Sequence, residues 1–475
     1  MNSTNRIGKG MIVILFANIV NLMVSVIRGF ILPKYLSIDS FALIKVYQLY
    51  ISYAGLAALG FIDGMYLKYG GKELAKIDLG KFSTNLSSFR IFQSVISLFI
   101  VFIGITIKDK ILVAVGITTV ALNLTDYYKS FFQAVGHFLK YSRIMNVSAI
   151  SLLIVNLVLI FVFHSDNAYL YIVSYVVIYY IVYVLLEITL RRNKMVQKPD
   201  LFFSFNECKE SVFSGFALMC GTLMSTFMMG MDRWFVIATS SNYDFAVYSF
   251  AASCVGFLSY AISPVSITLY NFFCGNNEKS VMEKSRRMIV VFCSYIIAAA
   301  YPIKFLLENY LDKYYNSIYI LFILFASQFI YGIILCYYVN IYKAKKMQNK
   351  YFIAIGIVVI FGIVLNIITY IILKRTEAFA IGTMLASVIW MILCCKDFNQ
   401  YRVSLKEIVY VMISVALFII SGFYCVSYIG FILYCTLITL LALMIMRKDL
   451  ISMLRFGMKS IFNMISKTTR KKDYI

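Results

Sequence analysis

The chain contains 475 residues, of which 61% are hydrophobic and only 14% are charged, and its mean hydropathy is +0.83. Soluble domains are nearer half apolar and about a quarter charged, so this composition excludes an ordinary soluble protein. The 44 basic residues outnumber the 22 acidic ones and give a formal net charge of +22. A charge of this size also occurs in nucleic-acid-binding proteins, so its distribution along the chain decides what it means.

Apolar runs long enough to cross a bilayer recur along nearly the whole sequence. A hydrocarbon core of roughly 30 Å needs about 20 apolar residues per helical crossing. The first run, 11–32, is longer than a signal-peptide core and lacks a cleavage pattern, so we interpret it as an uncleaved first span. We predict an all-α integral membrane protein with about fourteen spans, near residues 11–32, 41–62, 88–107, 111–134, 144–163, 169–190, 211–238, 244–272, 288–308, 317–340, 351–373, 379–395, 408–427 and 430–446.

The loops between these spans alternate in charge. One set, which includes both ends of the chain, holds 32 Lys and Arg residues, whereas the other holds 6. Short basic loops stay on the cytoplasmic side of a membrane, so we predict that both termini are cytoplasmic. The positive charge therefore has a topological cause, and we expect no nucleic-acid partner.

The final segment, 447–475, follows the last predicted span. Its apolar residues recur at helical spacing and are flanked by Arg455, Lys459 and Lys467. We interpret it as a basic amphipathic helix that lies on an anionic inner leaflet. The alternative is a docking site for a cytoplasmic partner.

A weak internal repeat relates the first and seventh predicted spans. Arg28 and Phe30 near the end of one correspond to Arg233 and Phe235 in the other, and Phe41 then corresponds to Phe245. Transporters are often built from such repeats. The repeat predicts two six-helix lobes followed by two extra helices, with the ranges 1–200, 201–405 and 406–446 before the tail 447–475.

Several motifs resemble the Wzx-type exporters of O-antigen and capsule repeat units. These proteins belong to the multidrug/oligosaccharidyl-lipid/polysaccharide (MOP) superfamily. The motifs are RGFILPKYL at 28–36, LGFIDG at 59–64, KYG at 68–70, FQAVG at 132–136, and MDR at 231–233 followed by Tyr248-Ser249. The resemblance covers the whole chain in length and layout.

The resemblance implies a MATE-like fold and a flippase, not an enzyme. The expected cargo is an oligosaccharide repeat unit linked to undecaprenyl diphosphate, moved across the bacterial cytoplasmic (inner) membrane by alternating access between the lobes. A polysaccharide polymerase and a chain-length regulator are the expected protein partners. Coupling to protons or sodium is a further expectation of the family.

Charged residues at membrane depth are the candidate cargo-binding residues, because burying a charge there costs at least about 2.5–3.5 kcal/mol. Arg28 and Arg233 are the leading pair, since the repeat gives them equivalent depths and Arg binds phosphate oxygens in a bidentate manner. The alternative for both is that they extend to the outer membrane surface. Asp126 and Lys129 are also candidates, although their spacing allows a self-contained helical ion pair.

Six further residues complete the set of candidates. We expect Asp232 to pair with a nearby basic residue. Asp63 and Gly64 are expected at the inner mouth, in a gating or helix-end role. For Lys45, Arg90 and Lys304, which lie near span ends, anchoring at the membrane interface is the favoured interpretation.

Other functions remain open at this stage. A lipid II flippase or a multidrug exporter of the same superfamily is the nearest alternative, and a membrane polysaccharide polymerase is a more distant one. The sequence contains no phosphate-binding loop of the G-x-x-x-x-G-K-[ST] type, which argues against an intrinsic ATPase. The ten cysteines lie mostly within apolar runs, and with only two histidines we expect neither a metal site nor a cofactor.

Overall fold

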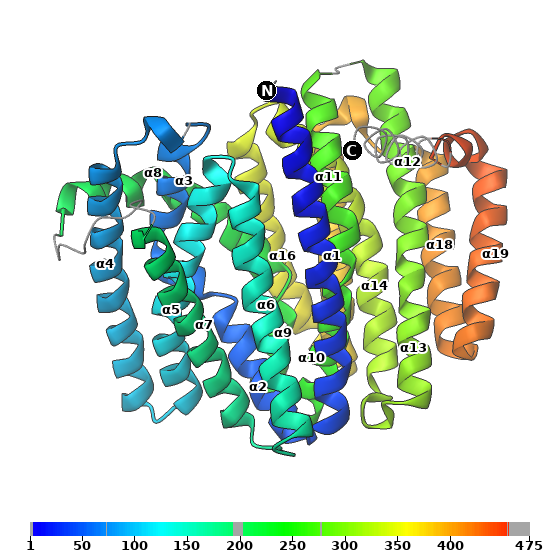
Figure 1. The fold of residues 1–475 in the computed structure, drawn as a ribbon. Coiled ribbons are helices and arrows are strands. Elements are labelled where there is room, and N and C mark those ends of the chain that lie inside the picture. The colour runs from blue at the N-terminus through cyan, green and yellow to red at the C-terminus, as the bar shows by residue number, and fades with distance from the viewer. Residues whose placement is uncertain (1–2, 73, 193–202, 276–277, 454, 456–475) are drawn as a thin grey trace, which may run out of the picture. The chain divides into compact units, whose positions relative to one another are not determined.

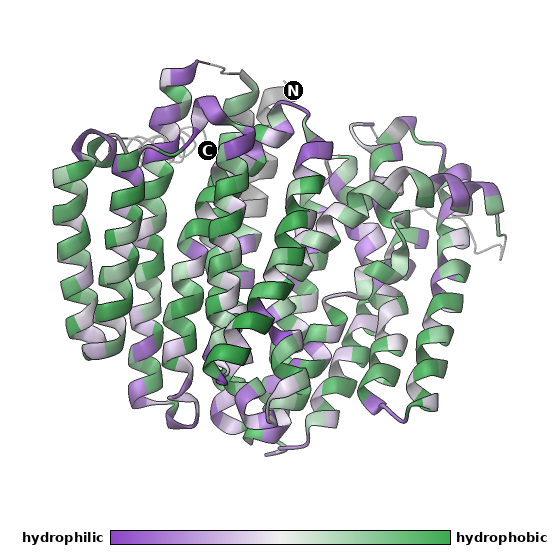
Figure 2. Ribbon diagram, turned by 180° about the vertical axis from the view of Figure 1, so that it is seen from behind, coloured by the Kyte–Doolittle hydropathy of each residue, from purple (hydrophilic) through white to green (hydrophobic). Residues whose placement is uncertain are grey.

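The computed structural model describes residues 3–72, 74–192, 203–275, 278–453 and 455 (Figure 1). Among these residues, fourteen helical segments are long and apolar enough to cross a membrane, which confirms the predicted number. Hydrophobic residues cover the middles of the helices and hydrophilic residues gather toward their ends (Figure 2). Helices suit this environment because every backbone hydrogen bond of the span is made within it. The chain is a multi-pass membrane protein.

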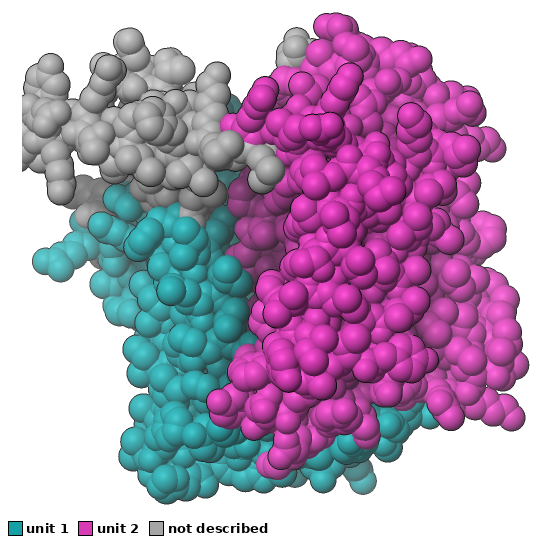
Figure 3. Space-filling view, turned by 90° about the vertical axis from the view of Figure 1, so that its right-hand side faces the viewer, with its two compact units in different colours: residues 1–249 teal, residues 250–475 magenta. Residues whose placement is uncertain are grey.

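The chain divides into two compact units, Met1–Ser249 and Phe250–Ile475 (Figure 3). The first unit includes the seventh span, which the repeat assigns to the second lobe. That span joins the first unit because its helix packs against helices of spans 2 and 3. The division into two six-helix lobes stays a prediction, and the tail 447–475 lies largely outside the described residues.

The first unit is arranged around one central helix, α5, which contacts α2, α3, α4, α6 and α7. Its α-helices are α1 (Ser3–Tyr35), α2 (Ile38–Ile51), α3 (Phe61–Tyr69), α4 (Leu79–Thr106), α5 (Lys110–Ala134), α6 (Phe138–Phe161), α7 (Ala168–Arg192), α8 (Phe205–Met228), α9 (Met231–Thr239) and α10 (Asn242–Gly256). Two 3₁₀ turns, η1 (Ala54–Ala58) and η2 (Leu74–Lys76), connect some of them. Helix α10 continues beyond the boundary between the units.

Polar side chains fix where several of these helices begin. The Asp78 carboxylate accepts hydrogen bonds from the backbone of Gly80 and Lys81, and Asp109 caps α5 in the same way. Ser204 caps α8 by accepting from the Glu207 backbone at 3.3 Å. Such caps satisfy amide groups that the first helical turn leaves unpaired.

The second and seventh spans are interrupted, which the apolar pattern did not predict. Span 2 consists of α2, η1 and α3, with a break in which Leu59 and Gly60 have φ of 45° and 83°. Span 7 consists of α8 and α9, separated at Met229 and Gly230. Span 8 is also interrupted, because α10 ends at Gly256 and α11 begins at Leu258. The breaks in spans 2 and 8 come within one residue of matching points of the proposed repeat, because α2 ends ten residues after Phe41 and α10 ends eleven residues after Phe245.

The second unit surrounds α14, which is buried along almost its whole length. Its elements are α11 (Leu258–Gly275), α12 (Lys279–Ile296), η3 (Ile297–Ala299), α13 (Ala300–Asn309), η4 (Asp312–Tyr314), α14 (Ser317–Ile333), η5 (Ile334–Tyr338), α15 (Val339–Ala344), α16 (Gln348–Leu373), α17 (Glu377–Asp397), η6 (Asn399–Tyr401), α18 (Leu405–Tyr424) and α19 (Ser427–Ile445). The segment η5 is a π-helical turn within span 10. Helices α12, α17 and α18 pack on α14, whereas α11 packs on η5 and α15.

Candidate functional site

Arg28 is directed into the helix bundle of the first unit. It donates a hydrogen bond to the hydroxyl of Tyr175 on α7, and its guanidinium carbon lies 5.1 Å from the centre of that ring. Gln48 on α2 donates to the same hydroxyl at 2.7 Å. Tyr175 is buried and lies on a different face of α7 from the exposed apolar residues Val177 and Ile181. Arg28 therefore interacts with the interior face of α7.

Further charges gather around the neighbouring turn of α7. The hydroxyl of Tyr179 interacts electrostatically with Arg28, Asp126 and Lys129. Asp126 and Lys129 form an ion pair one helical turn apart on α5, as their spacing predicted. The half-buried Lys45 ammonium on α2 donates to Gln48 at 3.1 Å.

We call this group the basic cluster. Its members are Arg28, Lys45, Gln48, Asp126, Lys129, Tyr175 and Tyr179, from α1, α2, α5 and α7. The basic cluster holds three basic side chains and one carboxylate, so its own members carry more positive than negative charge. The aromatic hydroxyls can exchange hydrogen bonds with an anion or a sugar. Lys45 belongs to this cluster, which its predicted role as an interface anchor did not suggest.

Arg233 lies at a second site, beside the breaks in spans 2 and 7. A side chain on Gly230 would come within 2.9 Å of the Arg233 guanidinium and 3.1 Å of the Tyr53 hydroxyl. Glycine at 230 therefore leaves room for both groups. The adjacent Trp234 stacks on Tyr50 of α2, with ring centres 5.3 Å apart and an interplanar angle of 12°.

Asp232 is buried and bonded to a tyrosine rather than to the basic side chain we expected. Its carboxylate accepts hydrogen bonds from the Tyr248 hydroxyl at 2.7 Å and from the Arg233 backbone at 2.8 Å. Arg233 also acts on it through its charge. The MDR and Tyr248-Ser249 motifs are therefore joined in space.

Arg28 and Arg233 have different local surroundings despite their positions in the repeat. Arg28 lies within the continuous helix α1 and contacts α7, whereas Arg233 follows a helix break and lies near η1. Span 2 connects the two sites, because Gln48 belongs to the first and Tyr50 packs against Trp234 at the second.

Two predicted interface anchors are instead structural. Arg90 on α4 donates to both carboxylate oxygens of Glu187 on α7, at 2.7 and 2.8 Å, and Glu187 also accepts from Tyr128. Lys304 is 4% exposed and donates to the Gly422 and Cys425 carbonyls near the end of α18. Both interpretations as anchors were wrong, because these side chains find buried partners on distant helices. Glu187 is an acidic residue within an apolar span, and this could have indicated from the sequence that Arg90 has a charged partner.

The predicted inner-mouth residues lie where α3 contacts α8. A Cβ on Gly64 would lie 1.9 Å from the Ser211 carbonyl oxygen, so the two backbones are in direct contact. Asp63, beside it, is half-buried, so its charged carboxylate loses part of its hydration.

Comparison with known proteins establishes the fold. The lipid II flippase MurJ, in an inward closed conformation, superimposes with a TM-score of 0.58 at 15% identity, covering 93% of this chain and 99% of that one. The fold is that of the MOP transporters. Two further transporter structures are similar at a lower level. A mutant of the Vibrio cholerae MATE transporter VcmN has a TM-score of 0.47 at 12% identity, covering 84% of this chain and 98% of that one. The eukaryotic MATE transporter AtDTX14 has a TM-score of 0.47 at 15% identity, covering 86% and 97%.

The sequence itself matches no protein-family profile and no curated protein. Of these three comparisons, only the structural one finds similar proteins. All ten cysteines of this MOP-fold chain are free thiols.

Proposed function

We propose that this protein is a flippase for an oligosaccharide repeat unit linked to undecaprenyl diphosphate. The observation that supports this most directly is the basic cluster. A diphosphate–sugar headgroup carries about two negative charges, and an uncompensated charge is costly at membrane depth. Fixed positive charges lower that barrier, and Arg28 offers the forked geometry that binds phosphate oxygens.

In this proposal Arg28 and Arg233 receive the diphosphate at successive stages of one passage. Lys129 and Asp126 adjust the local charge, and Asp232 orients the start of α9. The two predicted lobes alternate access to the two membrane faces, with the termini in the cytoplasm of a bacterial cell. Export of such units would serve O-antigen or capsule synthesis, with a polymerase and a chain-length regulator as partners.

Two alternatives within the fold differ in cargo. Lipid II shares the diphosphate and differs in its sugars, and the similarity to MurJ, a lipid II flippase, favours it equally. A multidrug exporter that carries cations would be expected to expose carboxylates to its cargo. The excess of positive over negative charge in the basic cluster favours an anionic cargo over a cation.

The test is transport by the purified protein in liposomes. A fluorescent lipid-diphosphate oligosaccharide, lipid II and a cationic dye are supplied in parallel, and an impermeant quencher reports which molecules cross. We expect transport of one or both diphosphates and none of the cation. Replacing Arg28 and Arg233 with Gln together should reduce that transport at least about tenfold, because each charge-assisted hydrogen bond contributes about 1.5–3 kcal/mol.

The matched control is Arg375→Gln, which removes an exposed guanidinium from the loop between α16 and α17. It should leave transport unchanged. Transport of the cation alone, or full transport of diphosphates by the double variant, would overturn the assignment of cargo or site respectively.

A further inference from the structure

Helices α3 and α8 meet in backbone contact over two turns. A Cβ on Gly64 would lie 1.9 Å from the Ser211 oxygen, and one on Gly215 would lie 2.0 Å from the Gly60 oxygen. Neither position tolerates even a methyl group while the helices remain together. We call this contact, together with the side chains at its end, the α3–α8 seam.

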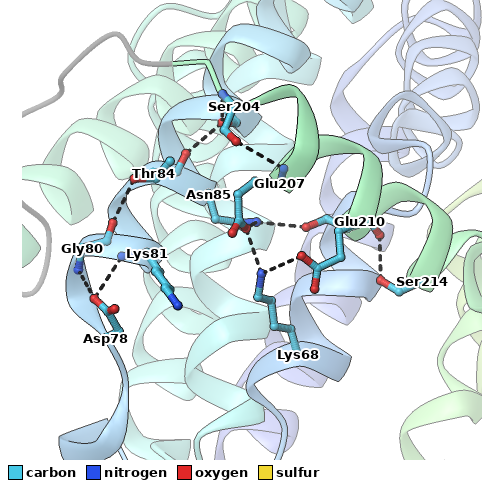
Figure 4. A network of polar contacts seen from close by, with 12 residues as sticks. Lys68, Asp78, Gly80, Lys81, Thr84, Asn85, Ser204, Glu207, Glu210 and Ser214 are labelled. Carbon is cyan, nitrogen blue, oxygen red and sulfur yellow. Dashed lines mark hydrogen bonds and ion pairs between the residues drawn. The ribbon is translucent and has the colours of Figure 1, made fainter.

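A polar network closes the end of the seam that the loop charges predict to be cytoplasmic (Figure 4). The Lys68 ammonium on α3 donates to Glu207 at 2.8 Å and to Glu210 at 3.3 Å, both on α8. Asn85 on α4, which is fully buried, donates to the same Glu207 oxygen at 3.1 Å and to Ser211 at 2.9 Å. Lys68 thus joins spans 2 and 7 at their inner ends.

Each helix of the seam has a break at one of its ends. Helix α3 is preceded by η1 and the two left-handed residues Leu59 and Gly60, and α8 ends before Gly230. Gly60 packs directly on Gly215 of α8, whereas the Tyr53 hydroxyl, at the start of η1, lies near Gly230, where a Cβ would be 3.1 Å from it. On the other side of the breaks, Trp234 stacks on Tyr50.

We infer that the α3–α8 seam is an inner gate, latched by Lys68, and that α3 and α8 open it by turning about these two breaks. The inference rests on the proposed transport function. The Tyr50–Trp234 contact holds the outer halves of spans 2 and 7 together while the inner halves separate.

The chemistry of the seam suits a contact that opens and closes repeatedly. Lys68 keeps 24% of its side-chain surface exposed, and its partners Glu207 and Glu210 keep 20% and 63%, so water reaches both ion pairs and the Lys68–Glu210 pair is replaced at little cost. The glycine contacts have no interlocking side chains to disengage. The Arg90–Glu187 pair between α4 and α7 contrasts with this, because its side chains are only 15% and 9% exposed and a buried pair is costly to separate.

A native thiol reports on the seam without reference to any cargo. Cys208 on α8 is buried at 7% exposure in a cluster with Met65 and Tyr69 of α3. Opening should expose it, so its alkylation by a maleimide, followed by peptide mass spectrometry, measures the open population. Cys254 and Cys394, 1% and 0% exposed, lie in the second unit and report global unfolding.

We expect Lys68→Met and Gly64→Ala each to raise the alkylation rate of Cys208 at least about tenfold, the effect of ~1.4 kcal/mol on an equilibrium. The rates at Cys254 and Cys394 should stay at their native values. The matched control is Gly221→Ala, also on α8, where a Cβ meets no atom within 4 Å. Unchanged Cys208 alkylation in both variants would overturn the gate.

A cross-link tests the same idea by holding the seam closed. In a Cys208→Ser background, Lys68→Cys and Glu210→Cys are joined by a short bismaleimide, and the variants that carry only one of these two new cysteines are the controls. We expect the cross-linked protein to lose transport of whichever cargo the native protein carries, and full transport while cross-linked would refute the gate. A native protein that carries none of the offered cargoes would count against the proposed function, whereas the alkylation result would still decide the gate.

Discussion

Tyr248 on α10 donates its hydroxyl hydrogen to the Asp232 carboxylate on α9 over 2.7 Å, and both side chains are at most 3% exposed. The contact joins span 7 to span 8 next to Arg233. The Asp232 carboxylate is held by hydrogen bonds, and among the described residues it forms no direct ion pair with a basic side chain. Its strength therefore determines how firmly α9 is held.

We expect Tyr248→Phe to destabilise the protein by about 1–3 kcal/mol, because the Asp232 oxygen loses a donor that buried surroundings cannot replace. Thermal unfolding in detergent, followed with a thiol-reactive dye, measures the change. Tyr424→Phe, at a tyrosine 84% exposed, is the control and should have no effect. An equal midpoint for the Tyr248 variant and the native protein would contradict the prediction.

The Arg90–Glu187 pair gives a second prediction. Arg90→Met leaves the Glu187 carboxylate, 9% exposed, with only the more exposed Arg191 and the Tyr128 hydroxyl as partners, and should cost about 1.5–3 kcal/mol. Arg191→Met removes the other arginine, which contacts the same oxygen at 2.7 Å but is 41% exposed. That change should cost at most about 1 kcal/mol, because water screens the exposed pair. Equal losses in the two unfolding midpoints would show that burial does not determine the strength of the pair.

The second unit allows a matched pair of glycine substitutions. A Cβ on Gly422 of α18 would lie 2.1 Å from the ring of Phe322, so Gly422→Ala should destabilise the protein by about 1–3 kcal/mol. Gly356→Ala on α16 meets nothing within 4 Å and should stabilise by roughly 0.5–1 kcal/mol through helix propensity. The two unfolding midpoints should move in opposite directions, and a shift in the same direction would be incompatible with the packing around Phe322.

Asp63 gives a prediction about the cost of a half-buried charge. Its carboxylate loses part of its hydration where α3 contacts α8, and burying a charged group costs free energy. Asp63→Asn removes the charge and should raise the unfolding midpoint at neutral pH.

Asp39→Asn is the control for this experiment. Asp39 also lies in the first turn of its helix, α2, but is exposed. Its change removes a favourable interaction with the helix terminus without relieving burial, so we expect no gain. If Asp63→Asn behaved as Asp39→Asn does at neutral pH, burial of Asp63 would not limit stability.

The number of spans was predictable because the membrane acts as one uniform solvent. A helix crossing it needs a fixed length of apolar residues, and hydropathy measures that directly. The Asp126–Lys129 pair was predictable for a related reason, since residues three apart on a helix are neighbours whatever surrounds them. Both features depend on sequence spacing alone.

The breaks and the distant partners were not predictable from that spacing. The residues around η1 are small and apolar, so hydropathy does not distinguish a broken span from a continuous one. The partners of Arg90 and Lys304 come from segments 97 and about 120 residues away, and nothing in the local pattern identifies them. Interface anchoring was favoured for these residues because they lie near span ends.

The π-helical turn η5 lets span 10 change neighbours partway along its length. Before the turn, α14 packs on α17 and α18, and from the turn onward the span packs on α11. After the turn, Asn340 donates to the Ser266 carbonyl at 2.8 Å. A π-helical turn holds one more residue than an α-helical turn, so the same residues in a regular α-helix would turn every later side chain by roughly 100° about the helix axis. The hydropathy profile would be identical, yet Asn340 would face the wrong helix, so the backbone conformation of this turn, and not its composition, determines which helix Asn340 meets.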